Sequence, residues 1–170
     1  MVNIFLVGFM GSGKSTVGEI LSKKTGLKFV DIDSEIEKKE KMSIKDIFEK
    51  KGEHYFRELE KKEIEEFSQK DGFVVSTGGG LGANPENMEK MKKHGVVVWL
   101  QVSLDEVLRR CGNDKNRPLL NQPLENLKKL FEDRQKVYSL ADIKINTESK
   151  EPEKLAEEIL EMLNENLHRY

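Results

Sequence analysis

The chain has 170 residues, 36% of them hydrophobic, and a formal net charge of −2 at pH 7. This length is typical of one domain with its own core, and so much apolar material excludes a disordered chain. The balanced charge argues against a dedicated nucleic-acid binder, and the longest apolar run, residues 96–100, is too short to span a membrane. A single Cys fits a reducing compartment, so we expect a cytoplasmic protein with neither a nucleic-acid nor a membrane partner.

The basic residues are divided unevenly between the two types. Lysine accounts for 23 of the 29 and arginine for six. Because arginine can bind an anion through two parallel hydrogen bonds and lysine cannot, each arginine is a candidate anion ligand. The six are Arg57, Arg109, Arg110, Arg117, Arg134 and Arg169.

Short apolar runs alternate with amphipathic stretches along the chain, which predicts strands alternating with helices. Continuous runs of Val, Ile and Phe are typical of strands covered on both faces, as in a parallel sheet. We therefore predict a single α/β domain over residues 1–170, with ligands at the carboxyl ends of its strands. The predicted strands are 3–7, 28–31, 73–76, 96–101 and 142–145. The predicted helices are 14–24, 34–50 with a break near 42–43, 53–69, 85–94, 104–111, 123–138 and 151–167.

The first predicted strand leads into residues 8–16, Gly-Phe-Met-Gly-Ser-Gly-Lys-Ser-Thr, which match G-x-x-x-x-G-K-[ST] between a strand and a helix. Glycines at this spacing let backbone N–H groups surround a phosphate, and the positive end of the next helix faces that anion. We expect Lys14 to reach the β- and γ-phosphates and the Ser15 hydroxyl to bind Mg²⁺. The loop predicts a bound nucleoside triphosphate, with contacts from Gly11, Ser12, Gly13, Lys14, Ser15 and Thr16.

The second predicted strand ends in Asp31-Ile32-Asp33, which carries two carboxylates. Alternation along a strand puts both on one face, beside the phosphate loop if the two strands are neighbours. One then serves Mg²⁺ through water, and the other orients an attacking hydroxyl and accepts its proton. The alternative is that Asp33 and Ser34 only cap the next helix.

Two arginines lie close to the apolar faces of predicted helices. Arg57 is on the flank of such a face, where Glu60 is positioned to brace it, although Glu63 projects onto the same face. Arg134 falls in the middle of the apolar face of helix 123–138. Because a buried guanidinium needs an anion, Arg134 is expected to bind either a structural carboxylate or a ligand.

Two further segments are candidates for ligand contact. Residues 77–80, Thr-Gly-Gly-Gly, follow the third strand, and they form either a close backbone approach to a ligand or a flexible turn. The polar stretch 112–122 is too long for an ordinary turn and is either a mobile functional loop or a disordered one. As a functional loop it would close as a lid and bring Arg117 over the γ-phosphate. Arg110, on the outward face of its helix, either stacks on the nucleotide base or lies in solvent.

Together these motifs resemble those of the shikimate kinase family, in order and over essentially the whole chain. The shared segments are 8–16, 31–33, 56–60 (Phe-Arg-x-x-Glu), 77–80, 117–120 (Arg-Pro-Leu-Leu) and 134–138 (Arg-x-x-x-Tyr). The resemblance implies a three-layer α/β/α P-loop NTPase fold with a five-stranded parallel sheet of order 2-3-1-4-5. It also implies a substrate-binding helical region at about 33–60 and a mobile lid at about 112–122.

The resemblance further implies ATP-dependent phosphorylation of the 3-hydroxyl of shikimate, on the route to chorismate and the aromatic amino acids, and we expect a monomer. Asp33 is then the base that holds the substrate hydroxyls, and Lys14 is a catalytic residue on the phosphates. Arg57 and Arg134 bind the substrate carboxylate beside the backbone of Gly79.

The same resemblance implies roles around the nucleotide and its metal. Ser15 and Asp31 organise Mg²⁺, and Arg117 is the catalytic lid residue on ATP. Arg110 matches an arginine that stacks on adenine, and Lys150 stands where many members place a polar residue against the nucleotide.

Two other interpretations stay open. Another small-molecule kinase of this fold would act on gluconate or a nucleoside monophosphate, and a nucleotide acceptor would put phosphate rather than carboxylate on the two arginines. A nucleotide-binding module without turnover is a different class of protein. Loss of Lys14, Asp33 or Arg117 would favour that module, and all three are present.

Overall fold

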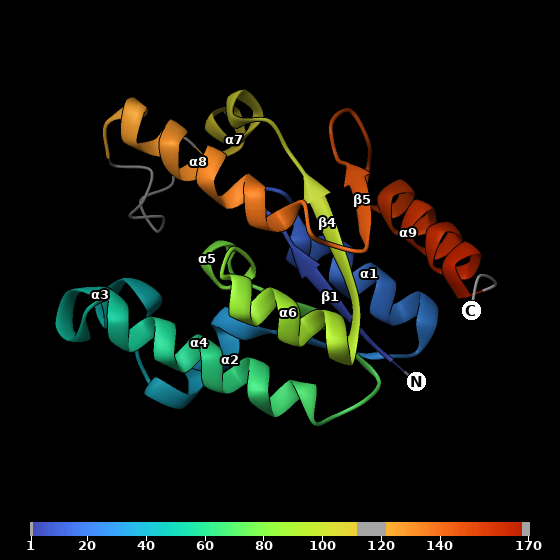
Figure 1. Cartoon of the computed structure of the whole chain (residues 1–170), viewed down its shortest axis with the longest axis horizontal. Coiled ribbons are helices and arrows are strands. Elements are labelled where there is room, and N and C mark those ends of the chain that lie inside the picture. The colour runs from blue at the N-terminus through green and yellow to red at the C-terminus, as the bar shows by residue number, and fades with distance from the viewer. Residues whose placement is uncertain (1, 112–121, 168–170) are drawn as a thin grey trace.

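A computed structural model describes residues 2–111 and 122–167, so the expected lid at about 112–122 lies outside the described residues except for residue 122. The centre of the fold is a parallel sheet of five strands in the order β2-β3-β1-β4-β5, as the family resemblance implies (Figure 1). The strands are β1 Asn3–Val7, β2 Lys28–Asp31, β3 Phe73–Ser76, β4 Gly95–Gln101 and β5 Ile143–Asn146.

Helices cover both faces of the sheet. Helices α1 and α9 pack against each other on one face, and the other described helices lie on the opposite face (Figure 1). None of the described helices is both long enough and apolar enough to cross a membrane. The helices are α1 Lys14–Thr25, α2 Ile32–Glu40, α3 Ile44–Lys51, α4 Glu53–Ser68, α5 Gly79–Gly82, α6 Pro85–His94, α7 Leu104–Cys111, α8 Leu124–Tyr138 and α9 Pro152–Leu167.

Alternation along the buried strands divides the core into two layers. In β1, Phe5 and Val7 belong to one hydrophobic cluster, while Ile4 and Leu6 belong to the other. Successive side chains of a strand point to opposite faces, so each apolar run supplies both clusters at once. The result is the predicted three-layer α/β/α arrangement.

The ends of the last two strands differ slightly from the prediction. Strand β4 begins one residue earlier, at Gly95, and β5 begins one residue later, at Ile143. Asp142 precedes β5, and its side chain takes part in the pairing with β4. Its carboxylate accepts the N–H of Val97 at 2.9 Å, and its own N–H donates to the Val97 carbonyl.

The glycines after β3 are more regular than expected. Residues 79–82 form the single helical turn α5, in which the Gly82 N–H donates to the Gly78 carbonyl at 3.2 Å. The predicted break between α2 and α3 is confirmed at residues 41–43. Ser43 then caps α3, its hydroxyl accepting the N–H of Asp46 at 3.1 Å.

Candidate active site

The phosphate loop joins the carboxyl end of β1 to α1, at the edge where the parallel strands end. Gly11 and Gly13 have φ of 78° and 88°, a left-handed conformation that other residues adopt at a cost. Lys14 folds back over the loop, and its Nζ donates to the carbonyls of Gly8 at 2.6 Å and Phe9 at 3.2 Å. The loop therefore has the shape that phosphate binding requires.

An oxygen-rich corner lies beside the loop, where β2 and β3 end. Ser15 Oγ donates to Asp31 Oδ2 at 2.6 Å and lies 3.3 Å from Ser76 Oγ. Hydroxyl and carboxylate oxygens are ligands that Mg²⁺ prefers, and this ion usually keeps waters and phosphate oxygens as its other ligands. The described residues include no cluster of three or more His, Cys, Asp or Glu suited to a metal. The corner fits a Mg²⁺ ion shared with nucleotide phosphates.

Asp33 reaches the cavity by a route other than the predicted one. Strand β2 ends at Asp31, so the two carboxylates do not alternate along a strand, and Asp33 is the second residue of α2. The capping alternative is also wrong, because Asp31 is the N-cap of α2 and accepts the N–H of Ser34 at 3.2 Å. A β-carbon on Gly78 would lie 3.0 Å from Asp33 Oδ1. Burial, followed by repulsion from Asp31, raises the pKa of Asp33 to about 6.

Arg57 and Glu60 form an ion pair on α4, with Nη1 and Oε1 2.7 Å apart, and Glu53 lies 3.3 Å from the other terminal nitrogen. Glu60 is only 1% exposed, and burial raises its pKa to about 7 although Arg57 acts in the opposite direction. Burial acts to lower the pKa of Arg57, but its two carboxylate neighbours outweigh this and raise it. Glu63 binds Lys39 instead, at 2.7 Å. Glu60, and not Glu63, is therefore the glutamate that pairs with Arg57.

Arg134 is buried on the inward face of α8, as its helical spacing predicts, with only 8% of the residue exposed. Its guanidinium carbon lies over the ring of Phe9, 5.6 Å from the centroid. Burial lowers the pKa of Arg134. Among residues 2–111 and 122–167, no carboxylate oxygen lies within ion-pair distance of this guanidinium. A structural carboxylate partner is therefore absent from the described part of the chain.

The glycine segment after β3 allows the two guanidinium groups to lie against the backbone. A β-carbon on Gly79 would be 2.9 Å from Arg134 Nη1. A β-carbon on Gly80 would be only 2.2 Å from Arg57 Nη1, which is a collision. Glycine at positions 79 and 80 therefore leaves room for the two guanidinium groups.

Residues of the phosphate loop, the oxygen-rich corner and the glycine segment line one cavity of about 550 Å³, together with Asp33, Arg57, Glu60 and Arg134. The phosphate loop forms one part of its wall, and side chains of α3, α4 and α8 form another. The predicted site residues that line it are Gly11, Gly13, Lys14, Ser15, Thr16, Asp31, Asp33, Arg57, Gly79 and Arg134. The phosphate loop and the guanidinium groups of Arg57 and Arg134 thus share one cavity. Ser12 is 1% exposed and lies within the loop.

Among the described residues, the expected nucleotide contacts that do not line this cavity are Ser12, Arg110 and Lys150. Arg110 donates from Nη1 to the Gly11 carbonyl at 2.9 Å and pairs with Glu106 at 2.8 Å, so it lies against the phosphate loop. Lys150 follows β5 and pairs with Glu158 at 3.0 Å. Arg117 lies outside the described residues.

Two residues that shape the site were assigned no role from the sequence. Ser76 ends β3 beside the oxygen-rich corner, and the Tyr138 hydroxyl donates to the Gly79 carbonyl at 2.5 Å. The sequence nevertheless contained a pattern that could have pointed to each of them. Ser76 is a polar residue at the carboxyl end of a buried strand, and Tyr138 lies one helical turn beyond Arg134 on the same face.

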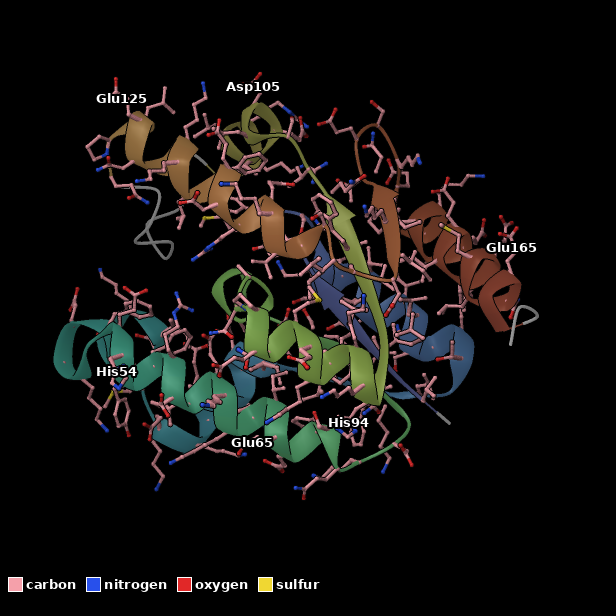
Figure 2. All side chains as sticks on the ribbon, viewed as in Figure 1. His54, Glu65, His94, Asp105, Glu125 and Glu165 are labelled. Atoms are coloured by element: carbon pink, nitrogen blue, oxygen red, sulfur yellow. The ribbon has the colours of Figure 1, made fainter. Side chains whose placement is uncertain are left out.

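Histidine does not contribute to the cavity within the described residues. Figure 2 shows His54 and His94 on the outer side of α4 and α6, and both are exposed. The carboxylates among the residues that line the cavity are Asp31, Asp33 and Glu60.

A phosphate loop, an oxygen-rich corner and a deep cavity with buried charges lie together at the carboxyl ends of parallel strands. This fold and this site define a P-loop kinase. Residues 10–164 match the family model described as shikimate kinase. The chain belongs to the shikimate kinase family, and it is a kinase of the shikimate pathway.

Relatives and solved structures agree with this membership. Shikimate kinase of Sulfurihydrogenibium sp. (strain YO3AOP1) is 64% identical over 160 residues, which cover 94% of this chain and 96% of the relative. The crystal structure of shikimate kinase from Aquifex aeolicus has a TM-score of 0.90 and 50% identity, covering 97% of this chain and 98% of that one. Shikimate kinase from Acinetobacter baumannii in complex with shikimate has a TM-score of 0.92 and 38% identity, covering 98% and 94%.

The alternatives raised from the sequence are not favoured by these comparisons. A gluconokinase from Sinorhizobium meliloti is similar with a TM-score of 0.58 but only 17% identity, covering 98% of this chain and 95% of that one. That likeness shows the fold alone. A nucleotide-binding module without turnover does not fit a family of kinases.

Proposed function

We propose that the chain transfers the γ-phosphoryl group of ATP to the 3-hydroxyl of shikimate, giving shikimate 3-phosphate and ADP, and that the 550 Å³ cavity binds shikimate. One observation carries the assignment of the cavity: Arg134 is buried in it with no ion-pair partner among the described residues. A buried guanidinium is costly unless an anion faces it, and the substrate carboxylate is that anion. Similarity to an enzyme solved with shikimate supports the same substrate.

The proposed carboxylate clamp consists of Arg57 and Arg134. Each guanidinium can donate two parallel hydrogen bonds to a carboxylate, which is why two arginines suit one anion. The two are not equivalent, because Arg57 already shares its charge with Glu60 at 2.7 Å. We therefore expect Arg134 to contribute more to substrate affinity than Arg57 does, with the Gly79 backbone beside it.

Asp33 is the proposed base. As the 3-hydroxyl oxygen attacks the γ-phosphorus, its proton passes to Asp33, a new P–O bond forms, and the bond to the bridging oxygen of ADP breaks. A pKa raised to about 6 leaves Asp33 largely ionised at neutral pH while making it a stronger base than an ordinary aspartate. Its Oδ1 has no hydrogen-bond partner among the described residues, so it is available to a substrate hydroxyl.

The nucleotide is proposed to bind along the phosphate loop, from Gly11 to Thr16. Lys14 then exchanges its contacts with two loop carbonyls for oxygens of the β- and γ-phosphates. Arg110 already lies on the Gly11 carbonyl of this loop, which supports its proposed contact with the nucleotide. Arg117 on the lid and Lys150 after β5 complete the proposed contacts.

Ser15 and Asp31 are the residues proposed to hold Mg²⁺, because their oxygens lie 2.6 Å apart beside the phosphate loop. When bound, the ion neutralises charge on the nucleotide phosphates. Asp31 has a second task as the N-cap of α2, so the same residue positions the helix that carries Asp33.

We also propose one domain, residues 1–170, that acts as a cytoplasmic monomer without nucleic-acid or membrane partners. The described strands form a single sheet, and residues of this one chain line the described part of the cavity. The large exposed hydrophobic residues of the described chain are scattered rather than clustered: Val2, Tyr55, Leu124 and Leu140. ATP as co-substrate supports the cytoplasm, and the net charge of −2 agrees with the lack of a polyanionic partner.

A coupled assay of ADP formation tests the proposed reaction. With ATP and Mg²⁺, we expect turnover when shikimate is added and none above background with gluconate, AMP or CMP. Omitting Mg²⁺ should abolish the shikimate-dependent rate. Faster turnover of any acceptor other than shikimate would overturn the assignment.

A further inference from the structure

Tyr138 is a completely buried tyrosine at the end of α8, one helical turn beyond Arg134. Its ring packs on the ring of Trp99, with centroids 6.0 Å apart, inside the hydrophobic cluster on this face of the sheet. A phenylalanine would fill the same volume without burying a polar atom. Packing therefore explains the ring of Tyr138 but leaves its hydroxyl unexplained.

The hydroxyl lies where the backbone of the glycine segment meets the carboxylate clamp. It donates its single proton to the Gly79 carbonyl at 2.5 Å. Arg134 Nη1 and the Tyr138 hydroxyl lie 2.9 Å and 3.4 Å from the same point, the position of a β-carbon on Gly79. With its proton committed to the carbonyl, the hydroxyl presents only lone pairs to the neighbouring guanidinium.

The electrostatics of the pair agree with this arrangement. Burial raises the pKa of Tyr138, while the nearby Arg134 acts to lower it. Because burial outweighs Arg134, the hydroxyl stays neutral and remains a donor at every working pH. Burial lowers the pKa of Arg134, and the attraction to Tyr138 opposes that shift. A neutral tyrosine beside Arg134 therefore leaves the charge of this buried cation unneutralised.

We propose that Tyr138 is the positioning residue of the carboxylate clamp: its hydroxyl holds the Gly79 backbone and orients the Arg134 guanidinium for the substrate carboxylate. A structural carboxylate in this place would compete with the substrate for Arg134, whereas a neutral hydroxyl fixes the direction of the guanidinium and leaves its charge for the ligand. Tyr138 acts through its two neighbours and need not touch shikimate. The inference rests on the proposed binding of shikimate by Arg134.

The test begins with the unaltered enzyme, whose turnover of shikimate checks the proposed function independently. In Tyr138→Phe we expect the KM for shikimate to rise about tenfold, the loss typical of one hydrogen bond to a charged group. The KM for ATP and kcat should stay within about twofold, and the melting temperature should change little because the ring is retained. Tyr55→Phe, which removes a partly exposed hydroxyl of α4, is the control and should change neither KM.

A double-mutant cycle separates positioning from a merely structural role. If Tyr138 acts through Arg134, Tyr138→Phe should cost almost nothing further in the Arg134→Lys background. Fully additive losses would overturn the proposal, as would equal losses for shikimate and ATP or an unchanged KM for shikimate. If Tyr138→Phe does not fold, binding of shikimate methyl ester to the unaltered enzyme decides. The ester lacks the carboxylate charge, and affinity equal to that of shikimate would refute the clamp that Tyr138 is proposed to orient.

Discussion

Arg134 and Arg57 show how differently two arginines of one site can be held. Arg57 is braced by Glu60 and Glu53, whereas Arg134 is buried with an aromatic ring and a tyrosine hydroxyl near it. A braced guanidinium keeps its position without substrate, and an unneutralised one attracts an anion more strongly. The proposed clamp thus combines a rigid arginine with an unneutralised one.

Replacing Arg134 by lysine should weaken the binding of shikimate far more than the binding of ATP. Lysine keeps the charge but loses the paired hydrogen bonds, so we expect the KM for shikimate to rise about 30- to 100-fold, corresponding to about 2–3 kcal/mol. Steady-state kinetics with each substrate varied in turn measures the difference. Arg109→Lys is the matched control, because that side chain is 73% exposed and pairs only with Glu106 among the described residues. Equal effects on both substrates would mean that Arg134 is structural.

The proposed base should show itself in the dependence of rate on pH. The pKa of Asp33 is raised to about 6 by burial, so kcat/KM should fall as the pH drops through that value and the base becomes protonated. Asp33→Asn should reduce kcat by about 10² to 10⁴ and remove this acidic limb. The exposed Asp71→Asn is the control. An acidic limb that persisted in Asp33→Asn would identify a different base.

At the scale of secondary-structure elements, the strands were predicted more accurately than the site residues that follow them. Three strands agree with their predicted bounds, because a buried run of Val, Ile and Phe is a local signal that ends where its polar neighbours begin. Helix α5 had no such signal, since glycine is a poor helix former and this turn is held by its surroundings. The start of α2 also lacked a clear local signal, so Asp33 was expected on a strand. In the structure the Ser34 N–H donates to the Asp31 side chain, and this capping contact marks where α2 begins.

The position of α5 against α4 leads to a prediction for Gly80. A β-carbon there would lie 2.2 Å from the Arg57 guanidinium, so Gly80→Ala should displace that side chain and raise the KM for shikimate about tenfold. Gly52→Ala is the control, because its β-carbon meets no atom within 4 Å and its φ of 87° produces only backbone strain. That control should lose stability without a change in KM. An unchanged KM in Gly80→Ala would show that Arg57 does not bind the substrate.

At the scale of the whole molecule, two buried carboxylates of the site make the free energy of unfolding depend on pH. Asp33 and Glu60 have ordinary pKa values of 3.8 and 4.5, raised in the folded protein to about 6 and about 7. Between these values the folded state holds protons that the unfolded state has released. Both groups therefore stabilise the fold at low pH, and this contribution is lost as the pH rises through about 6 to 7.

Asp33→Asn should accordingly raise the free energy of unfolding at pH 8, by about 1–2 kcal/mol, while having little effect at pH 4. Urea titrations at the two pH values measure the difference. Asp71→Asn should show no comparable dependence, because Asp71 is exposed. A loss of stability in Asp33→Asn at pH 8 would contradict the raised pKa of the native aspartate.

The sequence by itself determined the α/β class, the phosphate loop and the burial of Arg134, because each depends on residues close together in the chain. Spacing along one strand or one helix is enough to show which face a side chain occupies. The order of the sheet came from family resemblance, and the structure confirms it.

Only the tertiary structure decided which partners these residues have. The choice between Glu60 and Glu63 depended on Lys39, 24 residues from Glu63, and the pairing of Tyr138 with Gly79 joins positions 59 residues apart. Contacts of this kind depend on how helices pack on the sheet, which no local pattern encodes. For the same reason the sequence could show that Arg134 is buried but could not show that the described chain leaves its charge without an ion-pair partner.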